Sequence, residues 1–185
     1  MSNLYFVIGG AVFLAMLVAA LVVYSLRARK RRETTWDDLL QRLTRIDRDA
    51  IATIARDAED DGSDETLPPG GNFELGSDEI WRLLGGLEGL QVLENNCRVL
   101  VDIATYVQRY YPEALVVAEQ LRLNAREIEW HVGRLKGAAQ TGNLQASFAD
   151  YAQRAVVTYT HMTRLVLELC DHASLPGAAA LHQAI

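Results

Sequence analysis

The feature that most constrains this chain is an uncharged run near its N-terminus, LYFVIGGAVFLAMLVAALVVYSL, at positions 4–26. A helix of that length spans roughly 34 Å at 1.5 Å per residue, enough to cross a hydrocarbon core about 30 Å thick. Tyr5 and Tyr24 lie near its two ends, where aromatic rings favour the membrane interface. The run therefore predicts a transmembrane anchor within residues 1–26.

A cluster of basic residues, RARKRR, follows this run directly. A cleaved signal peptide carries its basic residues before a shorter apolar core, whereas no Lys or Arg precedes position 4 here. Basic residues flank a membrane span on its cytoplasmic side. We therefore expect an uncleaved anchor in a bacterial inner membrane, with the N-terminus outside and the rest of the chain cytoplasmic. Anionic lipid headgroups are the expected partners of the basic side chains Arg27, Arg29, Lys30, Arg31 and Arg32.

Charge is unevenly distributed along the 185 residues. The net charge is −6 at neutral pH, but the basic cluster holds five of the 18 basic residues, which leaves 13 basic against 24 acidic side chains elsewhere. An acidic body repels phosphate backbones, which argues against nucleic acid as a partner. Cys97 and Cys170 fall on apolar helical faces, and in a reducing cytoplasm we expect both to be free core residues.

After the anchor, apolar residues recur at helical spacing, and no segment alternates as a strand would. The first such pattern predicts an amphipathic helix over residues 36–58, which completes a juxtamembrane region at 27–58. The sequence leaves open whether this helix lies on the membrane or on the following domain. The next stretch, residues 59–76, is rich in acidic residues, Gly and Pro, and it predicts a solvated linker.

Three long helical patterns then fill residues 77–175, with Ser77 as the expected N-cap of the first. Gly85, Gly86 and Gly89 lie in its opening turns, where they predict a kink or a close approach to a neighbour. The last pattern keeps a four–three rhythm for more than three heptads. Its apolar members are Phe148, Ala152, Ala155, Tyr159, Met162, Val166, Leu169 and Ala173.

Short turns between long helices make neighbours antiparallel. The predicted fold class is therefore all-α, with a single transmembrane helix followed by a cytoplasmic antiparallel three- or four-helix bundle. Pro176 and Gly177 end the last pattern, and residues 176–185 are expected to form a flexible tail.

The middle pattern, residues 112–138, is apolar on two sides. Opposite its core stripe, Val116, Leu123 and Trp130 repeat every seven residues, and a helix of this kind is either central or serves a second interface. Arg126 and Arg134 flank Trp130 by one turn each. Trp and Arg are enriched in interface hot spots, so this side predicts a surface for a protein partner or a second copy. The alternative is that Trp130 packs under the 36–58 helix as a second core layer.

Possible chemistry centres on the stretch REIEWHVGRL, in which Glu127 and His131 are four residues apart. At 100° per residue both fall on the boundary of the buried stripe, within reach of water, where such a pair is ordinarily a surface contact. Helical dimetal sites repeat Glu-x-x-His, a spacing of three, on two helices, whereas the spacing here is four and the chain contains no Glu-x-x-His. A metal site would need Glu94 and His161 as well, but Glu94 has a simpler partner in Arg98 at i+4.

The sequence contains no phosphate-binding loop, CxxC pair or nucleophile elbow, so we expect neither catalysis nor a cofactor. The predicted function is binding, by a membrane-anchored helical module that forms homo-oligomers or docks a protein partner at the cytoplasmic membrane face. Two alternatives remain open at this point. One is a metal-binding helical bundle, and the other is a signalling adaptor whose bundle senses a ligand.

Overall fold

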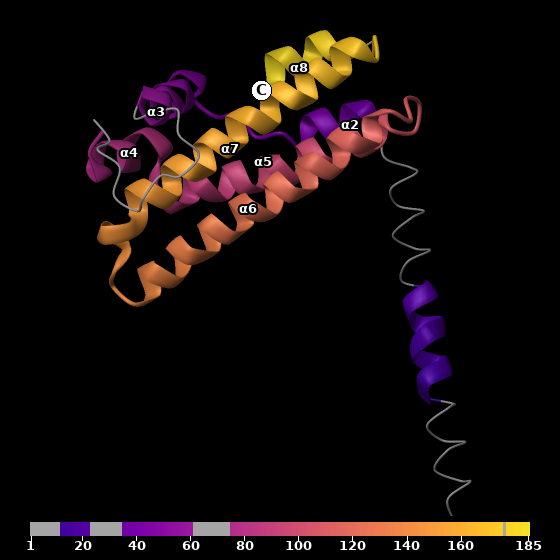
Figure 1. The fold of residues 1–185 in the computed structure, drawn as a ribbon, viewed down its shortest axis with the longest axis horizontal. Coiled ribbons are helices and arrows are strands. Elements are labelled where there is room, and N and C mark those ends of the chain that lie inside the picture. Colours follow the sequence, from indigo (N-terminus) through magenta and orange to yellow (C-terminus); the bar gives the residue numbers. More distant parts are fainter. Residues whose placement is uncertain (1–11, 23–34, 61–74, 176) are drawn as a thin grey trace, which may run out of the picture. The chain divides into compact units, whose positions relative to one another are not determined.

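The computed structural model describes residues 12–22, 35–60, 75–175 and 177–185 (Figure 1). Its first unit, Met1–Thr35, contains a helix over residues 12–22 whose apolar side chains are exposed. Among the residues described, no helix has both the length and the hydropathy needed to cross a membrane.

Three predictions fall wholly or largely outside the described residues. The predicted span at 4–26 is described only over its middle part, and the basic cluster at 27–32 is not described. Of the predicted linker at 59–76, residues 61–74 are likewise outside the described ranges.

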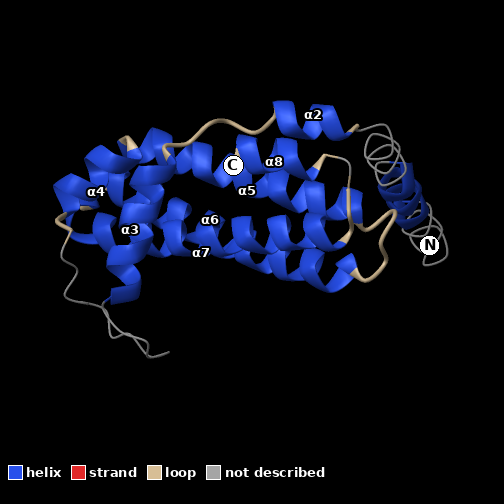
Figure 2. Ribbon diagram, turned by 90° about the horizontal axis from the view of Figure 1, so that it is seen from above, coloured by secondary structure: helices blue, strands red, loops and turns tan. Residues whose placement is uncertain are grey.

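The second unit, Trp36–Ile185, is helical with no strand in its described residues, which confirms the predicted all-α bundle. Three long helices lie side by side, and each runs antiparallel to the one before it in the chain (Figures 1 and 2). They are α5 (Gly86–Val107), α6 (Ala114–Gln140) and α7 (Leu144–His172). The shorter helices around them are α2 (Trp36–Gln41), α3 (Arg48–Asp60), α4 (Ser77–Leu84) and α8 (Ala178–Ala184).

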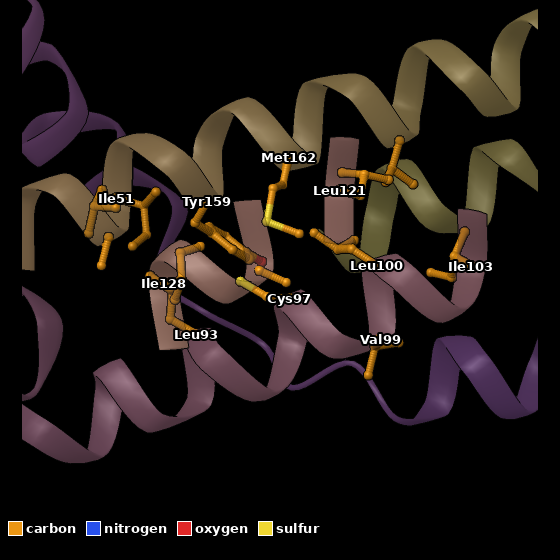
Figure 3. Packing of buried hydrophobic residues seen from close by; sticks show 14 of the residues in the cluster. Ile51, Leu93, Cys97, Val99, Leu100, Ile103, Leu121, Ile128, Tyr159 and Met162 are labelled. Atoms are coloured by element: carbon orange, nitrogen blue, oxygen red, sulfur yellow. The ribbon is translucent and has the colours of Figure 1, made fainter. Parts of the chain in front are cut away.

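The core lies where the long helices meet (Figure 3). Leu93, Cys97 and Leu100 from α5 pack with Ile128 from α6 and Met162 from α7, and all are buried. Each aliphatic side chain of this kind stabilises the fold by roughly 1.5–3 kcal/mol on burial. The four–three pattern of the last long helix is confirmed, because every member from Phe148 to Leu169 is buried and only Ala173 is half-buried.

Glycines break the first long pattern into α4 and α5. Gly85 and Gly86 both have positive φ, 74° and 69°, a backbone conformation that side chains with a Cβ disfavour. A Cβ on Gly89 would lie 1.6 Å from the carbonyl oxygen of Leu84, so the two helices meet at van der Waals contact with no room for a side chain. The predicted kink and close approach are both present. The N-cap is Gly76 rather than Ser77, because the carbonyl of Gly76 already accepts the first helical hydrogen bonds.

The helix predicted over residues 36–58 is interrupted between α2 and α3. Asp47 caps α3, since its Oδ1 accepts from the backbone N–H groups of Asp49 at 3.0 Å and Ala50 at 3.2 Å. Buried Asn96 on α5 holds the intervening segment, because its Oδ1 accepts from the N–H of Thr44 at 3.0 Å and its Nδ2 donates to the Thr44 carbonyl at 2.7 Å. Both backbone groups of Thr44 are thus paired outside a helix.

The apolar side of these two helices lies on the bundle, which settles the question that the sequence left open. Helix α2 contacts α5 and α8, and α3 contacts α4 and α7. Leu39 from α2 and Ile54 from α3 are fully buried as a result.

Replacing Asn96 with alanine should lower the free energy of unfolding by about 1–3 kcal/mol, because a buried two-point contact is lost. The neighbouring Asn95 is exposed, so Asn95→Ala is the matched control and should change stability by less than about 0.5 kcal/mol. Amide hydrogen exchange of Thr44 and its neighbours is the measurement. Unchanged protection of Thr44 in Asn96→Ala would contradict this role.

Residues 178–184 form α8, where the sequence predicted a flexible tail. Leu181 is fully buried, and Arg48 Nη2 donates to the carbonyls of His182 at 3.2 Å and Gln183 at 2.7 Å, which pairs two of the carbonyls at the C-terminal end of the helix. Just before α8, Gly177 lies so close to Trp36 that an added Cβ would come within 2.0 Å of the indole Nε1. The prediction of a flexible tail was wrong because these contacts come from residues far away in the sequence.

Candidate functional site

Helix α6 has one buried and one exposed apolar side, as its sequence predicts. Leu121, Ile128, Val132 and Leu135 are fully buried on the inner side. On the outer side, the exposed fractions are 76% for Val116, 58% for Leu123 and 55% for Trp130. We refer to these three residues as the outer stripe.

No other described helix covers the outer stripe. Helix α6 packs on α5 and α7, whereas α2 and α3 lie against other helices. The alternative in which Trp130 packs beneath residues 36–58 is therefore not what the structure shows. The outer stripe is a row of large apolar side chains with seven-residue spacing, and no helix among the described residues packs across it.

Trp130 is held in place from one side only. Its ring meets that of Tyr151 on α7 edge-on, with centroids 5.6 Å apart, and the guanidinium of Arg134 lies 5.7 Å from the indole centroid. Such contacts are each worth about 0.5–1.5 kcal/mol and fix the ring orientation. Arg126, the other flanking arginine, is exposed one turn earlier. The indole is thus positioned in advance with much of its surface open to a partner.

The environment of His131 differs from its prediction. The sequence placed both Glu127 and His131 within reach of water, and the side chain of Glu127 is indeed 53% exposed, but His131 is only 4% exposed. Tyr151 reaches across from α7, with its ring centroid 5.6 Å from that of His131, and Trp130 lies on another side at 5.0 Å. The sequence predicted the position of His131 on its helix correctly, but it could not show that Tyr151 from α7 covers the imidazole.

Burial determines the protonation of His131. The distance from its Nε2 to Glu127 Oε1 is 3.6 Å, too long for a good hydrogen bond, and neither ring nitrogen has a hydrogen-bond partner among the described residues. Desolvation lowers the pKa of His131 below its usual value near 6.5, and the adjacent Glu127 opposes this only in part. The imidazole is therefore held in its neutral form.

A pH dependence follows from this lowered pKa. In the unfolded chain His131 takes up a proton near its ordinary pKa, whereas in the folded chain it does so only at lower pH, so stability falls as the pH drops below about 6.5. We expect the free energy of unfolding to decrease between pH 7 and pH 5 in the wild type, and less steeply in His131→Phe, which keeps an aromatic ring but cannot titrate. Urea unfolding at several pH values is the measurement. If the free energy of unfolding falls equally with pH in both proteins, the pH dependence does not come from His131.

The remaining metal candidates have other surroundings. Glu94 is buried and accepts from Arg98, as predicted, while Lys136 Nζ lies 3.2 Å from its Oε2. Arg98 also bonds Glu129 on α6 at 3.0 Å, so these ions connect α5 to α6. His161 is exposed on α7. Within the described ranges, no three His, Cys, Asp or Glu side chains are grouped as metal coordination requires.

The two cysteines are free and buried, as predicted. Burial raises the pKa of both thiols, and for Cys170 it raises the pKa to about 12. Since the thiolate is the reactive form, both side chains are inert at neutral pH.

A hollow of about 310 Å³ lies between the start of α3, the middle of α7 and the end of α8. It was missed by sequence reasoning because its walls come from separate segments whose patterns show no shared signal. Its walls are mainly apolar, with three threonines and two arginines among them. The lining residues are Thr44, Ile46, Arg48, Ile51, Ala52, Tyr159, Thr160, Thr163, Arg164, Leu167, Ala184 and Ile185.

No family model matches this chain, and comparisons with curated proteins and with solved structures find no match either. What the chain does must therefore be inferred from its own residues and their arrangement.

Proposed function

We propose that this chain is a membrane-anchored interaction module that binds protein through the outer stripe of α6. The observation that carries the proposal is the exposure of Val116, Leu123 and Trp130 in one row. Single exposed apolar residues are common on soluble domains and need no explanation, but an aligned row containing a tryptophan is typical of a binding surface.

The membrane anchor is the second part of the proposal. It rests on the uncharged sequence at 4–26 and on the basic cluster that follows, and the described portion of that run is helical with exposed apolar side chains. An anchor in a bacterial inner membrane with the N-terminus outside would hold Trp36–Ile185 at the cytoplasmic face. Attraction of the cluster to anionic lipid adds about 1 kcal/mol per basic residue near the surface.

Binding would use Trp130 as its anchor residue. Because Arg134 and Tyr151 already fix the indole, a partner that covers it loses little additional side-chain freedom. Burial of the outer stripe would supply the hydrophobic part of the binding free energy, and the charged side chains beside it would determine how the partner is oriented.

Photo-crosslinking in membranes tests the binding surface. A photoreactive amino acid placed at Leu123 of the full-length chain should yield crosslinked products, whereas the same group at Glu88, an exposed position on α5, should not. Trp130→Ala should reduce the yield at Leu123 several-fold and leave helicity nearly unchanged, while loss of the contacts with Tyr151 and Arg134 lowers the melting temperature by a few degrees. Equal yields at the two positions, or none at either, would refute the proposal that the outer stripe is the binding surface.

The anchor is tested separately. The full-length chain should stay with the membrane after carbonate washing, and a reporter that is active only in the periplasm should be silent when fused after Ile185. Release by carbonate would refute the anchor, and an active reporter would reverse the orientation.

The hollow beside α8 favours a second candidate function, a module that senses a small ligand. Its apolar walls and the arginines Arg48 and Arg164 suit a molecule with an apolar body and one anionic group. Decanoate should then raise the melting temperature of the full-length chain, and Arg164→Gln should diminish that rise. Decanol, which lacks the charge, should act equally on both proteins. Equal effects of decanoate on both proteins would remove this candidate.

A further inference from the structure

We propose that the partner of the outer stripe is a second copy of this chain, and that the two α6 helices associate antiparallel with Leu123 at the centre. This inference rests on the proposed binding function of the stripe and names its occupant. It is carried by the shape and charge of the exposed side of α6, which complement themselves in the antiparallel register.

The apolar residues fit one another in that register. When Leu123 faces its equivalent, Val116 lies opposite Trp130 of the second copy, because each is seven residues from the centre. The smallest member of the stripe thus meets the largest at both ends, and the helix axes stay evenly separated. A parallel pair would place Trp130 against Trp130 and Val116 against Val116, which opens a gap at one end.

The charges beside the stripe also fit. At 100° per residue, Glu119 and Arg126 lie on the same flank, about 40° and 60° from Leu123. Equal flanks meet in an antiparallel pair, so Glu119 faces Arg126 of the second copy, and two-fold symmetry repeats this contact. Both side chains are exposed, and Glu119 forms an ion pair with Arg122 of its own helix that the contact with Arg126 would extend.

The other flank is compatible with this register. Glu127 meets the uncharged Gln120 there, and Arg134 meets the end of the second helix near Glu113. In a parallel pair Arg126 would meet Glu127 of the second copy, but Arg134, only about 20° from the centre of the stripe, would approach its own equivalent. The antiparallel register therefore avoids the like-charge contact that the parallel one creates.

The outer stripe is short, so we expect its affinity in free solution to be weak. Copies anchored in one membrane are concentrated relative to one another, as tethering raises the effective concentration of linked binding sites. Association of the anchored, full-length chain is therefore the relevant measurement.

Cysteine crosslinking in membranes that contain the full-length chain tests the register. The native Cys97 and Cys170 are buried, so the wild type should give no disulfide-linked dimer and serves as the control. Leu123→Cys should form a disulfide-linked dimer on mild oxidation. Val116→Cys should not, because its equivalent lies about 21 Å away along an antiparallel helix, and a disulfide needs Cα atoms within about 7 Å. Efficient dimers of Val116→Cys would overturn the register.

A charge reversal gives an independent readout. In the Leu123→Cys background, Glu119→Arg or Arg126→Glu alone should lower the dimer yield, roughly three- to tenfold, because each creates two like-charge contacts. The double reversal should restore it to within about twofold. In a parallel pair opposite flanks meet, so Glu119 and Arg126 do not face each other and the double reversal would not restore the yield. Failure of the rescue would therefore overturn the proposal, provided that circular dichroism shows all variants folded.

The outcomes separate this inference from the proposed function. If Leu123→Cys gives no self-dimer while the photoreactive group at Leu123 still yields products of another mass, the stripe binds a different protein and this inference fails alone. If neither experiment gives a product, both fail.

Discussion

Replacing Gly89 with alanine is expected to lower the free energy of unfolding by about 3 kcal/mol, at the upper end of overpacking effects. The added Cβ would lie 1.6 Å from the carbonyl oxygen of Leu84 and 2.7 Å from its carbonyl carbon. Both atoms belong to the backbone, so no side-chain rotation relieves the overlap. Either α4 must move away from α5 or the turn at Gly85 must deform.

The same chain offers a matched control for this substitution. Gly133 lies inside α6, and a Cβ there would have no atom within 4 Å, so Gly133→Ala should stabilise by roughly 0.5–1 kcal/mol through helix propensity alone. Urea unfolding followed by circular dichroism measures both variants. Equal stabilities of Gly89→Ala and the wild type would show that α4 and α5 do not meet as described.

Truncating Ile128 to alanine should cost about 3 kcal/mol, whereas truncating Leu123 in the same helix should cost less than about 0.5 kcal/mol. Ile128 is fully buried where α5, α6 and α7 meet, so its removal leaves a cavity (Figure 3). Leu123 is more than half exposed and leaves none. The two residues differ in which side of α6 they occupy and hardly in their chemistry.

Thermal and urea unfolding of the two variants, with crosslinking of each, distinguishes the two sides of α6. Leu123→Ala should keep its stability and lose association, and Ile128→Ala should show the reverse at temperatures where it remains folded. A large loss of stability in Leu123→Ala would mean that the outer stripe is part of the core and that both proposals about it are wrong.

Periodicity predicted the long helices well because it reports which side of a helix is buried. The members of the last pattern from Phe148 to Leu169 are all buried, and the outer stripe of α6 is separated from its core side as its seven-residue spacing indicated. Gly85 and Gly89 also marked the true break, since their conformational and steric requirements are local.

The features that sequence reasoning missed are those decided by distant residues. Residues 36–58 keep a helical apolar pattern across the break, but Asn96 of α5 takes the backbone groups of Thr44 out of a helix. His131 lies at the predicted position on its helix, but Tyr151 from α7 buries it, so it is not within reach of water. Pro176 and Gly177 look like the end of the fold, yet α8 follows because Leu181 has a site in the core.

The contact between Gly177 and Trp36 can form only late in synthesis, because the two residues are far apart in the sequence. Translation proceeds at about 5–20 residues per second, so Trp36 leaves the ribosome on the order of ten seconds before Gly177 does. During that interval the indole has its contact with Tyr106 available but lacks the one with Gly177. A nascent chain that stalls in α7 would therefore expose the side of Trp36 that Gly177 later covers, and incompletely folded chains of this kind are sorted by chaperones and proteases.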